Sequence, residues 1–151
     1  MSAAPDIRTG RCLCGAVSFE GRNPPADYGI CHCRMCRQWT GSALVGVSFK
    51  KDDVTWTGSD AIAEHVSSSW AKRGFCRVCG SNLYFQFTAE GTYADETEIP
   101  LGLFDDPNGF RLRSEIYVDE APDSYGFRGE GHPRLTRAEV IARLPILGGE
   151  G

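Results

Sequence analysis

The chain has 151 residues, of which 41% are hydrophobic and 24% charged, as expected for a globular protein with a buried core. Its formal net charge is −4 and no stretch is strongly basic, which argues against nucleic-acid binding. The N-terminal segment MSAAPDIRTGR lacks the apolar run of a signal peptide, and the longest apolar stretch, residues 43–47, is too short to span a bilayer. We therefore expect a cytoplasmic protein without membrane contact, whose thiols stay reduced.

Short alternating or β-branched segments run through most of the chain and predict a mainly β fold. In chain order, the expected strands are residues 16–20, 43–49, 54–57, 62–68, 82–87, 98–103 and 112–118. Runs of Gly, Pro, Asn and Asp separate them, which favours mainly antiparallel sheets. A short helical turn is also expected after Cys33.

One clear helix is expected near the C-terminus. Thr136 and Glu139 have the spacing of a capping box, and Leu135 and Val140 can form the hydrophobic staple beside it. The helix should reach about residue 144, because Pro145 stops it. No long linker divides the chain, so we expect one domain over residues 5–147, with loose tails at 1–4 and 148–151.

Seven cysteines form three tight clusters, which divide into a set of four and a set of three. The set of four contains Cys12, Cys14, Cys76 and Cys79, and the set of three contains Cys31, Cys33 and Cys36. Four thiolates saturate the tetrahedral shell of a structural zinc, whereas three leave one position open for water or substrate. The odd number also prevents complete disulfide pairing within the chain. The pattern therefore predicts two zinc ions, one structural and one at an open site.

The predicted structural site consists of two motifs that each end in glycine, CLCG at residues 12–15 and CRVCG at residues 76–80. Glycine permits the sharp backbone turn that aims amide hydrogens at the sulfurs. Zinc would join two distant parts of the chain and contribute on the order of ten kcal/mol to folding. The alternatives are a redox C-x-x-C pair or four buried free thiols, but the βαβ pattern typical of a redox pair is absent.

The predicted open site is CHCRMC at residues 31–36. In an extended segment Cys31 and Cys33 project to one side and His32 to the other, so His32 is a poor fourth ligand and a half-buried strand histidine is expected. Water, a ligand, or an Asp or Glu from elsewhere would complete the shell. His65 and His132 are expected to be ordinary surface residues.

A zinc on three thiolates carries a net −1 charge and is a weaker Lewis acid than zinc on neutral histidines. It still favours a deprotonated thiol, which points to thiol chemistry rather than hydrolysis. Basic residues crowd the clusters: Arg11, Arg34, Arg37, Lys72, Arg73 and Arg77. They can offset the anionic metal centres, and some can bind the carboxylates of a substrate, Arg34 and Arg37 being the candidates.

These motifs resemble the glutathione-dependent formaldehyde-activating enzymes, which share a domain with centromere protein V. The resemblance is carried by GRCLCG (10–15), CHCRMCRQWTGSA (31–43), FCRVCGSNL (75–83) and a weaker LGLFDDP (101–107). It implies a β-tent of coiled antiparallel sheets, with a structural zinc on the set of four cysteines and a second zinc on the set of three. Two positions depart from the family pattern, because Glu115 replaces a frequent histidine and Asp123 a frequent tryptophan.

The implied reaction adds the thiol of glutathione to formaldehyde, giving S-hydroxymethylglutathione, so we expect a carbon–sulfur lyase acting on glutathione or a related thiol and a small aldehyde. The thiol would coordinate the open zinc or displace it, and proximity could supply most of the rate effect. A non-catalytic zinc-stabilised module that binds a thiol or a protein is the main alternative. Trp39, Trp56 and Trp70 could line its binding surface, although a tryptophan is more often a core residue. A redox or zinc-storage role is a third.

Overall fold

The computed structural model describes residues 7–149, which form two compact units. The first contains residues 7–26 and 47–109, and the second contains residues 27–46 and 110–149. Strand β4 (Leu44–Lys50) begins in the second unit and ends in the first. Helices are few and short, so the expected mainly β class is confirmed.

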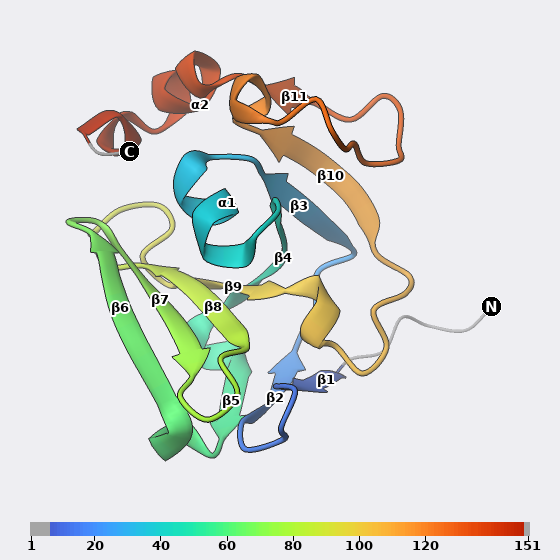
Figure 1. Ribbon diagram of the computed structural model, residues 1–151, viewed down its shortest axis with the longest axis vertical. Helices are drawn as coiled ribbons and strands as arrows, with labels where there is room; N and C mark the ends of the chain where they lie inside the picture. The colour runs from blue at the N-terminus through green and yellow to red at the C-terminus, as the bar shows by residue number, and fades with distance from the viewer. Residues whose placement is uncertain (1–6, 150–151) are drawn as a thin grey trace. The chain divides into compact units, whose positions relative to one another are not determined.

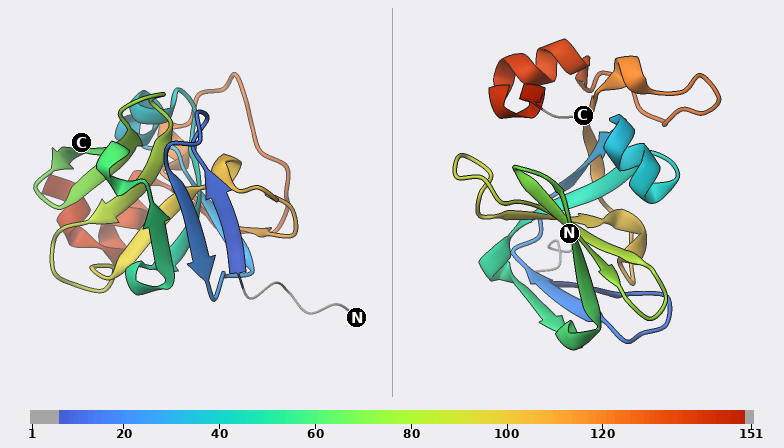
Figure 2. Two further views of the ribbon diagram at one scale, coloured as in Figure 1. Left: turned by 90° about the horizontal axis from the view of Figure 1, so that it is seen from below. Right: turned by 60° about the vertical axis from the view of Figure 1, so that its left-hand side comes forward.

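The first unit is built from two sets of antiparallel strands (Figure 1). In the first set β2 pairs on one side with β1, as Figure 2 shows at its left, and on the other side with β5. These strands are β1 (Ile7–Arg11), β2 (Ser18–Arg22) and β5 (Val54–Thr57). The second set has the order β9-β8-β7-β6 and contains β6 (Ile62–Ser68), β7 (Ala71–Cys76), β8 (Asn82–Phe87) and β9 (Glu96–Pro100).

A buried cluster in this unit contains cysteines as well as ordinary apolar side chains: Cys12, Val17, Cys76, Leu83 and Tyr84. Three 3₁₀ turns occur in the connections: η1 (Lys51–Asp53), η2 (Ser59–Ala61) and η3 (Leu101–Leu103). Two of the predicted metal ligands are therefore part of the hydrophobic core, where an unpaired thiolate would be costly.

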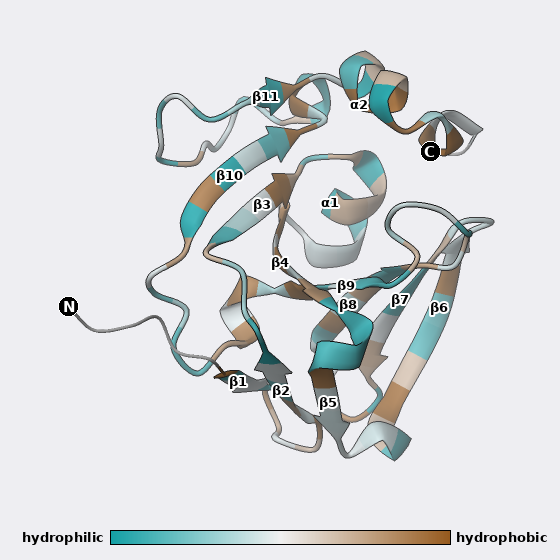
Figure 3. Ribbon diagram, turned by 180° about the vertical axis from the view of Figure 1, so that it is seen from behind, coloured by the Kyte–Doolittle hydropathy of each residue, from teal (hydrophilic) through white to brown (hydrophobic). Residues whose placement is uncertain are grey.

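The second unit has the strand order β11-β10-β3-β4. Strand β10 runs parallel to both its neighbours, whereas β3 and β4 are antiparallel. Strand β10 carries strongly hydrophilic residues separated by apolar or weakly polar ones (Figure 3). The remaining elements are β3 (Asp27–Cys31), α1 (Arg34–Thr40), β10 (Arg111–Ile116), η4 (Val118–Glu120), β11 (Arg134–Leu135), α2 (Arg137–Arg143) and η5 (Pro145–Gly149).

The expected C-terminal helix is present as α2, which lies next to η5 at the end of the described chain (Figure 2). The side chain of Thr136 accepts from the N–H of Glu139, and the Glu139 carboxylate accepts from the N–H of Thr136, so the predicted capping box is confirmed. Of the predicted tails, residues 148 and 149 belong to η5, and residues 1–4, 150 and 151 lie outside the described part. Between residues 7 and 149, no helix has both the length and the apolar character needed to cross a membrane.

Candidate metal centres and active site

Four cysteine sulfurs converge in the first unit with the spacing of a tetrahedral metal site. The sulfurs of Cys12, Cys14, Cys76 and Cys79 all lie within 4.8 Å of one another. The Cys14 Sγ is 3.6 Å from that of Cys12 and 3.9 Å from that of Cys76. Tetrahedral zinc with bonds of about 2.3 Å would separate its sulfurs by about 3.8 Å. The four residues therefore fit the structural zinc that the sequence predicts.

The backbone around these sulfurs turns as a metal knuckle requires. Gly15 and Gly80 adopt left-handed conformations with φ of 79° and 80°, which a residue with a Cβ adopts only at a cost. After the first turn, the N–H groups of the next two residues lie 3.5 Å from the Cys14 sulfur and 3.3 Å from the Cys12 sulfur. The sharp turns predicted at the two glycines are confirmed.

The sulfurs of this site compete for negative charge. The N–H of Ala16 favours the Cys14 thiolate, but lost hydration and three neighbouring sulfurs together raise its pKa to about 11. The hydroxyl and backbone of Ser81 have the opposite effect on Cys79 and lower its pKa to about 5. Four thiolates at this spacing repel one another, and a divalent cation removes that repulsion.

The three-cysteine site lies in the second unit, where β3 ends and α1 begins. Cys31 is the last residue of β3 and pairs with Ile116 of β10 and with Leu44 of β4. Cys33 caps α1, and its sulfur accepts a hydrogen bond of 3.3 Å from the N–H of Cys36. The three sulfurs lie within 4.8 Å of one another, and no other His, Cys, Asp or Glu of residues 7–149 joins them.

This site also favours a cation. The thiols of Cys33 and Cys36, together with burial, raise the pKa of Cys31 well above its ordinary value. A metal ion would stabilise the three thiolates, and the described chain supplies three sulfurs for a shell that holds four ligands. The chemistry of these donors fits a zinc site with one exchangeable position.

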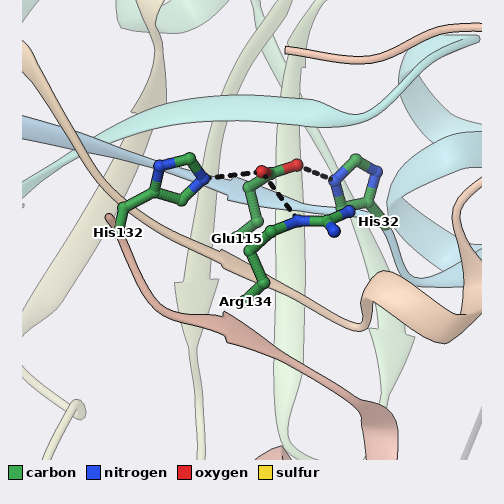
Figure 4. Close-up of polar contacts among 4 residues, drawn as sticks. All are labelled: His32, Glu115, His132 and Arg134. Carbon is green, nitrogen blue, oxygen red and sulfur yellow. Dashed lines mark hydrogen bonds and ion pairs between the residues drawn. The ribbon is translucent and has the colours of Figure 1, made fainter. Parts of the chain in front are cut away.

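His32, the histidine between the first two cysteines of this site, belongs to a polar cluster centred on Glu115 (Figure 4). The Glu115 carboxylate accepts hydrogen bonds from Nε2 of His32 at 2.8 Å and from Nε2 of His132 at 2.7 Å. Arg134 Nε donates to the same carboxylate at 3.2 Å. The side chains of Glu115, His32 and His132 are 5%, 3% and 7% exposed, whereas that of Arg134 is 59% exposed.

The contacts of His32 agree with the prediction that it is not a fourth ligand, since its Nε2 bonds Glu115 instead. It is more buried than the expected half-buried strand histidine, and it lies just beyond β3. The expectation that His132 is an ordinary surface residue is wrong, because its ring is buried against Glu115. His65 is exposed, as expected. Burial raises the pKa of Glu115, but the hydrogen bonds from the two histidines outweigh it and the pKa is lowered.

The strand register explains how these residues meet. Glu115 pairs with Ile30 of β3 and with Arg134 of β11, while Cys31 pairs with the next residue of β10, Ile116. Side chains alternate between the faces of a sheet, so the glutamate and Cys31 project from opposite faces. The polar cluster therefore fixes the histidine from the face opposite to the first cysteine ligand.

Tyr117 directly follows β10 and has a left-handed backbone, with φ of 56° and ψ of 43°. This conformation is uncommon for a bulky residue and costs free energy. The residue is 6% exposed, and the guanidinium of Arg137 lies over its ring at 5.7 Å from the centroid. Burial and the charges of Cys31 and Cys33 raise the pKa of the Tyr117 phenol.

Acidic residues of η4 connect Tyr117 to both helices of the second unit. Glu120 accepts a hydrogen bond of 2.9 Å from the N–H of Arg34 and lies 3.4 Å from a guanidinium nitrogen of Arg137. Asp119 accepts from the N–H of Arg137 at 2.6 Å. The starts of α1 and α2 are thus attached to the same short turn.

The two arginines proposed to bind substrate lie on α1, next to the three-cysteine site. Arg34 is exposed, and one guanidinium nitrogen donates to Gln38 at 2.9 Å. Arg37 is partly buried, and its Nε is buried without a hydrogen-bond partner in the described structure. Residues that the sequence did not single out as functional, Glu115, His132 and Tyr117, complete the surroundings of the site.

Three comparisons place the chain among known proteins. Residues 7–120 match the family described as glutathione-dependent formaldehyde-activating enzyme. An uncharacterized lyase of Schizosaccharomyces pombe is 31% identical over 120 residues, which cover 78% of this chain and 83% of the yeast protein. A crystal structure of a Rhodobacter sphaeroides protein is similar in fold, with a TM-score of 0.54 and 22% identity over 85% of this chain and 99% of that one. The chain therefore belongs to the family of glutathione-dependent formaldehyde-activating enzymes.

Proposed function

We propose that this protein is a zinc-dependent carbon–sulfur lyase that catalyses the reversible addition of a thiol to a small aldehyde. Glutathione, or a related thiol, and formaldehyde are the proposed reactants, as the family description suggests. The product would be the S-hydroxymethyl adduct of the thiol.

The observation that carries this proposal is the three-cysteine site itself. Three sulfurs converge within 4.8 Å, and the described chain contributes no fourth ligand, so a metal held there would have a position for a thiol. The four-cysteine site has no such position, because its sulfurs complete a tetrahedral shell. We therefore assign the chemistry to Cys31, Cys33 and Cys36, and stabilisation of the fold to the other four cysteines.

Zinc bound by the three thiolates would favour the ionised form of the substrate thiol and would bind sulfur readily. The residues of the protein would hold the rest of the substrate. The buried Nε of Arg37 lacks a partner, and a carboxylate of glutathione could supply one. Arg34 lies one turn earlier on α1 and could bind a second carboxylate from the helix surface.

We also propose a cytoplasmic location and a single functional domain for this protein. All seven cysteines are free, which supports a reducing compartment such as the cytoplasm. The family match runs from residue 7 to residue 120 and includes parts of both compact units, which supports a single functional domain over residues 5–147. We propose no nucleic-acid or membrane partner.

The test is exchange NMR at equilibrium with ¹³C-formaldehyde and glutathione, because the uncatalysed addition proceeds at a measurable rate. We expect zinc-loaded protein to increase the exchange rate, and the increase to saturate with glutathione. Cys36→Ser is the matched control, since it removes one sulfur of the proposed open site and none of the other. Saturable glutathione binding without faster exchange would identify a non-catalytic thiol-binding module instead.

A further inference from the structure

Tyr117 combines features that a purely structural tyrosine does not need. It is buried, its backbone is left-handed, and it is not part of a strand or helix. The other residue of 7–149 with positive φ that is not glycine is Asn23, and asparagine tolerates this conformation far better. Strain of this kind is typical of functional sites, where surrounding contacts hold a side chain in one place.

The backbone conformation changes where the side chain goes. Ile116 pairs with Cys31, and a regular strand would send the next side chain to the opposite face, where Glu115 meets the histidines. The left-handed residue ends the strand and removes this alternation. The N–H of His32 donates to the carbonyl of Ile116 at 3.0 Å, so Tyr117 directly follows a residue that is bonded to the three-cysteine motif. Burial and the charges of Cys31 and Cys33 raise the pKa of its phenol.

The Tyr117 hydroxyl has no hydrogen-bond partner in the described part of the chain. Buried tyrosines usually find a hydrogen-bond partner for their hydroxyl, but in residues 7–149 no group accepts from or donates to the Tyr117 hydroxyl. The ring is held in place by Arg137, whose guanidinium lies 5.7 Å from its centroid and is attached to Glu120. A positioned donor without an acceptor in the described chain is thus carried by the residue that follows Ile116, the strand partner of Cys31.

We propose that the Tyr117 hydroxyl donates a hydrogen bond to the aldehyde oxygen while the thiolate attacks, and to the hydroxymethyl oxygen of the product. The proposal rests on the proposed function, and it adds a catalytic residue to that site. As the carbon–sulfur bond forms, the π electrons of the carbonyl move to oxygen, which takes up a proton in place of the one that the thiol lost. Nothing is oxidised or reduced. A fixed donor at this oxygen stabilises the charge that develops in the transition state.

The kinetic test compares the wild type, Tyr117→Phe and Tyr84→Phe. Phenylalanine keeps the ring beneath Arg137 and removes the hydroxyl alone. Tyr84 is the matched control, because it is equally buried at 6% exposure but lies in the first unit and bonds Glu64 at 2.6 Å. We expect Tyr117→Phe to lower kcat by about 10- to 100-fold with unchanged KM for glutathione, and Tyr84→Phe to leave both constants unchanged.

A binding test does not depend on turnover. Cobalt-loaded protein is titrated with 2-mercaptoethanol and with ethanethiol, two small thiols of which the first carries a hydroxyl. We expect the wild type to bind 2-mercaptoethanol about two- to tenfold more tightly, and Tyr117→Phe to lose this preference. A wild type that does not accelerate exchange would refute the proposed function, while the thiol comparison still tests the contact of Tyr117 with a ligand oxygen. Unchanged kcat in Tyr117→Phe, an equal preference in both proteins, or an altered cobalt spectrum before thiol is added would overturn the inference.

Discussion

Removing the Glu115 carboxylate should destabilise the second unit by an amount that follows from its partners. In Glu115→Leu, His32 and His132 each lose the acceptor of a ring N–H, at sites where their side chains are 3% and 7% exposed. Each orphaned buried donor costs about 1–3 kcal/mol, whereas water can replace the contact to the exposed Arg134. Removing a buried carboxylate also removes its desolvation cost, so we expect a net loss of about 2–4 kcal/mol.

Glu115→Gln should cost less, about 1–2 kcal/mol, because the amide can still accept from one histidine. The Nε2 of the other histidine would have to accept a hydrogen bond from the amide N–H. This requires the tautomer of that histidine in which the ring proton is on Nδ1. For His32 that nitrogen is buried without a partner in the described structure. The measurement is equilibrium unfolding in urea at saturating zinc. The control is Glu130→Gln, at an exposed glutamate two residues before His132 in the chain. If Glu115→Leu is as stable as the wild type to within about 0.5 kcal/mol, the histidines do not depend on this carboxylate and the reasoning fails.

Three further predictions concern the metal sites, the substrate and pH. Cys12→Ser should prevent soluble folding, whereas Cys36→Ser should give a folded protein with one zinc, as thermal melts and metal analysis will show; equal destabilisation would mean that the two sites do not differ in role. Arg34→Ala should weaken glutathione binding by about 1–3 kcal/mol without loss of zinc. Calorimetry with glutathione and with its neutral diamide tests the contact between Arg34 and a carboxylate. If the diamide binds as tightly as glutathione, this contact does not exist. Burial opposes ionisation of Glu64, but hydrogen bonds from Tyr84 and Lys72 outweigh it and lower the pKa of this carboxyl. The ionised Glu64 therefore contributes its full stabilisation of the fold above the ordinary carboxyl pKa, and this contribution is lost as pH falls through the lowered pKa. The stability gap between wild type and Glu64→Gln, below about 1 kcal/mol because the side chain is 39% exposed, should therefore stay constant at neutral pH and narrow as pH falls from the ordinary carboxyl pKa through the lowered one. A gap that stays constant over this acidic range would contradict this assignment.

Most elements with a strong local pattern could be predicted from the sequence. The strands at residues 54–57, 62–68 and 82–87 occur at the expected positions, because their β-branched and aromatic residues favour extended backbone. Strands β1, β3 and β7 were not expected, since glycine and charged residues interrupt their patterns. These strands are stabilised by pairing with β2, β10 and β6, respectively, and such pairing between separate segments cannot be predicted from a short window of sequence.

The candidate site shows the same division. The candidate metal ligands could be identified because their spacing is a local property, and the structure groups the cysteines as expected. The contact between Glu115 and His132 could not, because it joins residues 17 positions apart and depends on the parallel register of β10 and β11. The antiparallel arrangement expected from short strands holds for most pairs, but not for the two made by β10. Tyr117 carries no local pattern, since the role proposed for it depends on a left-handed backbone conformation that the sequence does not reveal.

The distance along the chain between the two halves of the four-cysteine site has a consequence for synthesis. Cys14 and Cys76 are 62 residues apart, and all three cysteines of the other site lie between them. On the ribosome, five thiols therefore emerge before the second half of the structural site is made. Zinc that binds early can bridge the N-terminal pair to the middle cluster, and the chain must exchange these ligands before it can fold. We expect the rate of refolding to depend on when zinc is supplied. Zinc added to the unfolded chain should give slower refolding than zinc added after the chain has collapsed.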